Sequence, residues 1–92
     1  MGRADELLGS IVVSRAGRDE GEHYLVIGTL GEGMVLLADG DRRPVDRPKK
    51  KNIKHVRVVE VDPALKEKLT SGGQVTDAEV RAALLRSLSK IS

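Results

Sequence analysis

Several residue types that support common protein functions are absent or scarce in this sequence. The 92 residues contain no Cys, no Trp, no Phe and a single Tyr. Without Cys the chain has no disulfides and no thiolate zinc site, so a small hydrophobic core has to stabilise it. We expect a reducing, cytoplasmic setting, which this composition permits. A single aromatic residue also excludes an aromatic platform on which unpaired bases could stack.

Long apolar runs are missing as well. The longest, Met34–Ala38, has five residues, and the residues before Leu7 lead into no hydrophobic segment. A membrane-spanning helix needs about 20 apolar residues. We therefore expect no transmembrane helix, no signal peptide and no membrane partner. With 39% hydrophobic and 33% charged residues, the composition fits one small soluble globular domain.

Charge is distributed unevenly along the chain. The formal net charge is +2, but residues 1–40 hold 3 cations and 7 anions, whereas residues 41–57 hold 8 cations and 2 anions. A surface shaped only by solubility mixes the two signs. The concentration of positive charge therefore favours a strip that binds a polyanion. The alternative is an ordinary solvated loop, because lysine-rich runs are easily kept hydrated.

Short runs of β-branched and aliphatic residues follow residue 9, separated by Gly, Asp and Pro. They predict five strands at about 10–13, 23–30, 34–38, 42–45, and from 53 or 55 to 61. Asp39-Gly40 predicts a tight hairpin after the third strand, and Pro44 places the fourth strand at a sheet edge. Arg47–Asn52 is expected to be an exposed basic loop. A change in apolar phase predicts that the fifth strand has a bulge or turns a barrel corner.

Helix signals begin where the strand pattern ends. Asp62 before Pro63 is a typical helix start and predicts a helix over 64–69. Thr76 and Glu79 form a capping-box pattern that starts a second helix, ending near Ser89. Five strands without intervening helices predict a small antiparallel barrel. We thus expect a mainly β fold, with a flexible lead-in (1–8), a five-stranded barrel (9–61) and a C-terminal helical extension (62–92).

The segment Gly9–Ile27 reads GSIVVSRAGRDEGEHYLVI. It resembles the KOW motif, a strand-loop-strand unit of ribosomal proteins and transcription elongation factors. Residues 35–40 and the basic segment through His55 are similar to the rest of the SH3-like barrel in the large-subunit ribosomal KOW proteins of archaea and eukaryotes. The whole chain is similar to the short bacterial KOW-domain RNA-binding proteins. The resemblance implies an SH3-like barrel and a ribonucleoprotein function in translation.

No convergent set of catalytic groups is evident. Only His23 and His55 could act as a base or a metal ligand, and neither has a carboxylate at a recognised motif spacing. The glycines at 31 and 33 lack the remainder of any nucleotide-binding fingerprint. We expect no enzyme activity, no cofactor, no metal and no small-molecule substrate.

The leading hypothesis is an RNA-binding protein of the ribosome that contacts phosphates. Its candidate residues are the cations Arg15, Arg18, Arg42, Arg43, Arg47, Lys49, Lys50, Lys51, Lys54 and Arg57. The alternative is a protein–protein interaction module of the translation or transcription machinery. Its interface would be the helical stripe of Val80, Leu84 and Leu88, although packing of this stripe on the protein's own barrel is the simpler interpretation.

Overall fold

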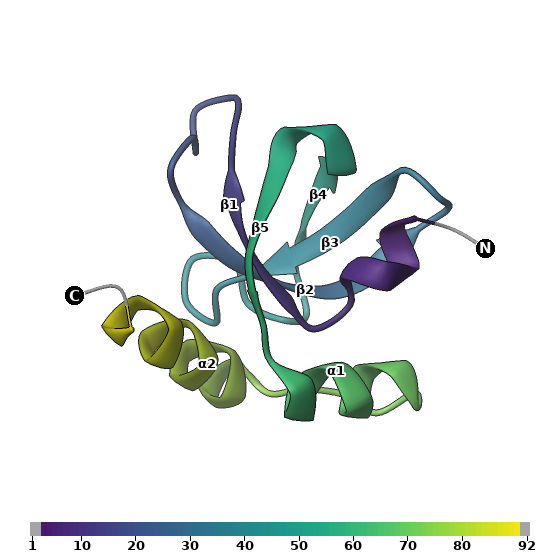
Figure 1. The fold of residues 1–92 in the computed structure, drawn as a ribbon, viewed down its shortest axis with the longest axis vertical. Helices are drawn as coiled ribbons and strands as arrows, with labels where there is room; N and C mark the ends of the chain where they lie inside the picture. The colour runs from purple at the N-terminus through teal and green to yellow at the C-terminus, as the bar shows by residue number, and fades with distance from the viewer. Residues whose placement is uncertain (1–2, 91–92) are drawn as a thin grey trace.

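The computed structural model describes residues 3–90 and shows a curled β-sheet followed by two helices (Figure 1). Residues 1, 2, 91 and 92, at the outer ends of the predicted lead-in and helical extension, lie outside the described residues. The elements are η1 (Ala4–Leu7), β1 (Ser10–Ser14), β2 (His23–Leu30), β3 (Met34–Ala38), β4 (Lys49–Asn52), η2 (Ile53–His55), β5 (Val56–Val61), α1 (Pro63–Thr70) and α2 (Asp77–Ser89).

The five strands form one antiparallel sheet in the order β4-β3-β2-β1-β5. The two edge strands, β4 and β5, are joined by the short 3-10 turn η2, so the sheet has to curl to bring them near each other (Figure 1). Within residues 3–90, each strand pairs only with its neighbours in this order, and β4 does not pair with β5. The fold is therefore a mainly β, curled and open sheet.

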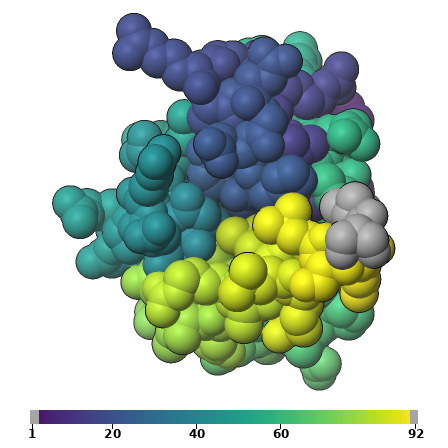
Figure 2. Space-filling model, turned by 90° about the vertical axis from the view of Figure 1, so that its left-hand side faces the viewer, coloured from purple at the N-terminus to yellow at the C-terminus, as the bar shows by residue number. Residues whose placement is uncertain are grey.

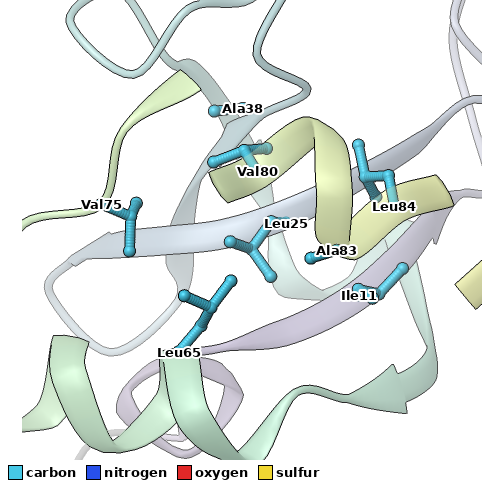
Figure 3. Packing of buried hydrophobic residues seen from close by; sticks show 8 residues of the cluster. All are labelled: Ile11, Leu25, Ala38, Leu65, Val75, Val80, Ala83 and Leu84. Carbon is cyan, nitrogen blue, oxygen red and sulfur yellow. The ribbon is translucent and has the colours of Figure 1, made fainter. Parts of the chain in front are cut away.

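Both faces of the sheet carry a hydrophobic cluster. Ile11 and Leu25 point to one face, where they pack against Val80, Ala83 and other side chains of the C-terminal part (Figure 3). We call this the helix face. The next residues along each strand, such as Val12 and Val26, lie on the opposite, inner face, because successive side chains alternate. Burial on both sides explains why the middle of β2 is almost wholly apolar.

The inner face is enclosed by the curl of the sheet. Its cluster consists of Ala4, Val12, Tyr24, Val26, Val35, Leu37 and Val56. Ala4 is fully buried, and its N–H donates to the carbonyl of Glu32 at 3.2 Å. Residues 4–7, predicted as part of a flexible lead-in, thus form a 3-10 turn that packs on the sheet.

The fourth strand is the main correction to the sequence-based prediction. Residues 42–45 form no strand, and β4 consists instead of Lys49–Asn52, which had been expected to be an exposed loop. Asp39 Oδ1 accepts hydrogen bonds from the backbone N–H groups of Asp41 and Arg43, both at 2.9 Å. These bonds fold the chain locally after β3, so the predicted two-residue hairpin becomes the longer connection 39–48. Lysines can form the ladder because its hydrogen bonds use only backbone atoms.

Most of the other predicted elements are confirmed. β2 and β3 have the predicted bounds, and a register shift between Ile11 and Val12 against β5 confirms the predicted bulge. The fifth strand begins at Val56, after η2. Both helices start at the predicted caps: Asp62 accepts from the N–H of Leu65, and the capping box of Thr76 and Glu79 is complete. No helix in residues 3–90 is long and apolar enough to cross a membrane.

Candidate nucleic-acid interface

The β1–β2 loop, residues 15–22, is the centre of the candidate site. The N–H of Arg15 donates to the carbonyl of His55 at 2.8 Å, which joins the loop to η2. The base of the loop is closed by the Ser14 N–H to the Glu22 carbonyl and the Gly21 N–H to the Ser14 carbonyl, both at 2.9 Å. Gly21 has a φ of +92°, a conformation that residues with a side chain adopt at a cost. The loop therefore has a defined shape.

Asp19 connects this loop to the sheet. Its side chain is only 11% exposed and receives four donors. Ser14 Oγ and Lys51 Nζ contact Oδ1 at 2.9 and 2.7 Å, and Tyr24 OH and Lys49 Nζ contact Oδ2, both at 2.9 Å. Burial raises the pKa of Asp19, but the hydrogen bonds from the two lysines, Tyr24 and Ser14 outweigh it and hold the pKa far below its usual value. The carboxylate is therefore ionised at neutral pH.

Tyr24 belongs to the inner-face core and is 5% exposed. Burial, followed by its hydrogen bond to Asp19, raises the pKa of Tyr24 well above its usual value. Its ring is enclosed in the core, where it cannot stack on a base, and its hydroxyl serves the Asp19 network.

The three consecutive lysines of β4 differ in their surroundings. Lys49 and Lys51 pair with Leu37 and Val35 on β3, so they lie on the inner-face side, where both reach Asp19. Their side chains are 25% and 10% exposed. Lys50, between them, lies on the opposite face and is exposed. The lysine run therefore presents one exposed cation and two that are ion-paired.

Three arginine candidates line a cavity beside the loop. Arg18, Arg42 and Arg43 share about 450 Å³ with Lys49, the edge of Tyr24 and four carboxylates, those of Asp19, Glu22, Asp39 and Asp41. Figure 2 looks onto this side of the molecule, with the loop near residue 20 in blue beside the connection near residue 40 in teal. Cations and anions are equal in number around this cavity, so it concentrates little net potential.

A second group of cations forms no ion pair within residues 3–90. Arg15 follows β1, Lys54 lies in η2 and Arg57 lies in β5, and all three are exposed. Lys54 lines a separate pocket with Glu6, Val56 and Val58, whereas Arg57 alternates to the other face of β5. Arg57 pairs with Val13, two residues before Arg15, so the two arginines lie diagonally across neighbouring strands. We call Arg15, Lys54 and Arg57 the β1–β5 cationic group. Among the ten candidate cations, all within the described chain, only Lys49 and Lys51 form ion pairs.

The two remaining candidates stand apart from these groups. Arg47 is exposed in the β3–β4 connection, where its N–H donates to the Pro44 carbonyl at 3.0 Å, and Lys50 is on β4. His23 and His55, in β2 and η2, join no group of three or more metal-binding side chains within residues 3–90.

The helical stripe proposed for a protein partner is largely used inside the molecule. Val80 is fully buried and Leu84 is 8% exposed, both in the helix-face core. Leu88 and its neighbour Leu85 are 44% and 65% exposed. The stripe therefore packs α2 onto the sheet.

Asp19 is the residue that sequence reasoning missed. Its partners on β4 lie about 30 positions further along the chain, and no spacing rule connects them before β4 is placed. The only sequence signal is an acidic residue between Gly17 and Gly21, which by itself suggests an ordinary turn.

These features define a small, mainly β protein with exposed cations around one loop of a curled sheet. No model of a known protein family matches the chain. It is 39% identical over 62 residues to the Bacillus subtilis (strain 168) protein named "Putative ribosome-binding protein YbzG", a match that covers 66% of this chain and 84% of the Bacillus protein. At this identity and coverage, the chain belongs to the same family as that Bacillus protein.

Proposed function

We propose that this protein binds the ribosome, in the cytoplasm, as a non-catalytic RNA-binding module. The observation that carries the proposal is its kinship with a Bacillus protein whose name states ribosome binding. The excess of 8 cations over 2 anions in residues 41–57 supports it independently, because ribosomal RNA is a polyanion.

We further propose that the curled sheet is an SH3-like barrel of the KOW type. The supporting features are the glycine-bounded loop between β1 and β2, the strand order and the 3-10 turn before β5. In this proposal the β1–β2 loop is the KOW loop, and its arginines point toward RNA.

The β1–β5 cationic group is the first candidate for the RNA contact. Arginines can hold a phosphate with paired donors, and Lys54 adds a flexible charge. Around the Arg18 cavity, the carboxylates compete with phosphate for the cations, so we rank Arg18, Arg42 and Arg43 second. Because the chain has one Tyr and no Phe or Trp, recognition should rest on phosphates and 2′-hydroxyls of structured RNA.

The test is binding of the purified protein to ribosomal RNA and to a DNA duplex of equal length, across a salt series. The variant R15Q/K54Q/R57Q should lower the slope of log affinity against log salt by about 2 to 3. The matched control, K68Q/R86Q/K90Q, removes the same charge from three surface ion pairs on the helices. Equal losses in both variants would reduce the interaction to generic charge attraction, and no loss in the first would contradict the proposed surface.

The protein-interaction alternative makes a different prediction for the same assay. If α2 docks a ribosomal protein, changing the exposed Leu85 and Leu88 to Ser should abolish ribosome binding while affinity for naked ribosomal RNA stays unchanged. We expect the opposite result, with ribosome binding retained.

A further inference from the structure

We propose that Asp19 is a positioning residue that decides which cations reach RNA at the loop end of the sheet, where the β1–β2 loop (residues 15–22) meets β4. Its ion pairs keep Lys49 and Lys51 from contacting RNA phosphates. Its contacts also hold in place the β1–β2 loop, which carries Arg15 and Arg18. This inference rests on the proposed RNA-binding function and adds the selection of contacts within that site.

Both carboxylate oxygens of Asp19 already have hydrogen-bond donors. Each carboxylate oxygen has one hydroxyl and one ammonium donor: Ser14 and Lys51 at Oδ1, Tyr24 and Lys49 at Oδ2. These donors come from β1, β2 and β4. A single side chain from the loop is thus tied to three strands of the sheet.

Lys51 has little left to offer a phosphate, and Lys49 is held by its ion pair with Asp19 Oδ2 at 2.9 Å. Lys51 Nζ also donates to the carbonyl of Ala16 at 2.9 Å, so two of its three donor positions are occupied. Moving either lysine to RNA would leave an ionised, largely buried carboxylate with fewer partners, which is unfavourable. The cluster keeps one net positive charge, so it still adds to the long-range field without forming a direct contact.

The same contacts hold the exposed arginines in place. Arg15 precedes Ala16, whose carbonyl accepts from Lys51, and Arg18 precedes Asp19. Each arginine is therefore next in sequence to an anchored residue. A loop ordered before binding loses less conformational entropy when it meets a structured RNA, which favours the RNA whose phosphates match its geometry.

The decisive experiment measures the salt slope and the ratio of ribosomal RNA to DNA affinity for a set of variants. D19N keeps the size of the side chain but releases Lys49 and Lys51. We expect a salt slope steeper by about 1 to 2, because one or two more cations reach phosphate, and a several-fold lower RNA-to-DNA ratio. In D19N/K49Q/K51Q the slope should return to that of the natural protein.

Single variants in the natural background complete the test. K49Q and K51Q should leave the salt slope unchanged. K50Q is the reference, because it shows how much the slope changes when a β4 lysine that forms no ion pair is removed. A slope lowered by about 1 in K49Q or K51Q would overturn the inference, even if D19N failed to fold. So would a D19N protein that is less stable but has an unchanged slope and ratio. If the natural protein did not bind RNA at all, that result would contradict the proposed function itself, not only the role of Asp19.

Discussion

The helix face and the loop end of the sheet are stabilised in different ways: apolar packing dominates at the helix face, and buried ion pairs dominate at the loop end. On the helix side, Leu25, Val80 and their neighbours form an apolar core, and the ion pairs lie outside it, as with Lys68 and Glu79, whose side chains are 42% and 36% exposed. At the loop end, the ion pairs of Asp19 are themselves largely buried. Removing one partner of an ion pair should therefore cost little on the helix side and much more at the loop end, where it leaves a largely buried charge without a partner.

The largest effect expected from this comparison is that of D19A. The change leaves Lys49 and Lys51 without their carboxylate and the Tyr24 hydroxyl without its acceptor, whereas Ser14 keeps the Ala16 carbonyl at 3.0 Å. We expect the free energy of unfolding to fall by about 3–5 kcal/mol. Urea unfolding followed by circular dichroism measures this. E20A, an exposed acid in the same loop, is the control and should change it by less than about 0.5 kcal/mol.

L25A should have the corresponding effect on the helix side. Leu25 is fully buried between the sheet and the helices, so its loss leaves a cavity and should cost about 2–4 kcal/mol in the same assay. L85A removes the same atoms from a side chain that is 65% exposed and should cost less than about 0.5 kcal/mol. Similar losses for the two leucines would contradict the packing of α2.

The dependence of stability on pH should distinguish the two regions. Because the folded-state pKa of Asp19 is lowered, its contribution is complete above the unfolded-state pKa, about 3.9, and is lost as the pH falls toward the folded-state value. The stability difference between the natural protein and D19N should therefore be smaller at pH 2.5 than at pH 7. The difference between the natural protein and L25A should stay constant, and parallel changes for both variants would argue against the buried ion pair.

T76A should produce a smaller loss. The Thr76 hydroxyl accepts from the N–H of Glu79 at 3.1 Å and completes the capping box of α2. Its removal should cost about 1 kcal/mol in thermal or urea unfolding. T76S, which keeps the hydroxyl, should recover most of it.

The smallest effect is expected for K68Q. It removes an exposed ion pair with Glu79, so the free energy of unfolding should change by less than about 1 kcal/mol and the difference should shrink in high salt. An effect as large as that of D19A would show that exposure does not explain the contrast between the two regions.

Local signals in the sequence account for what could be predicted. β2, β3 and both helices follow from apolar runs, turn residues and caps within a few positions of one another. β4 was missed because lysines have no strand pattern, and their pairing depends on β3, more than ten residues earlier. The charge count identified the cations of the candidate site, but only the fold separates the paired Lys49 and Lys51 from the exposed Lys50, since the separation depends on Asp19.

The lysines of β4 also bear on how the molecule behaves when it is concentrated. A sheet with two unpaired edges can add a strand from a neighbouring copy and begin to aggregate. One edge here is β4, where a second copy would have to bring its own three lysines alongside. The other edge is β5, which has a bulge beside Val12 and exposes Arg57. Repulsion at one edge and an irregular backbone at the other both disfavour the addition of a strand from a second copy of this protein.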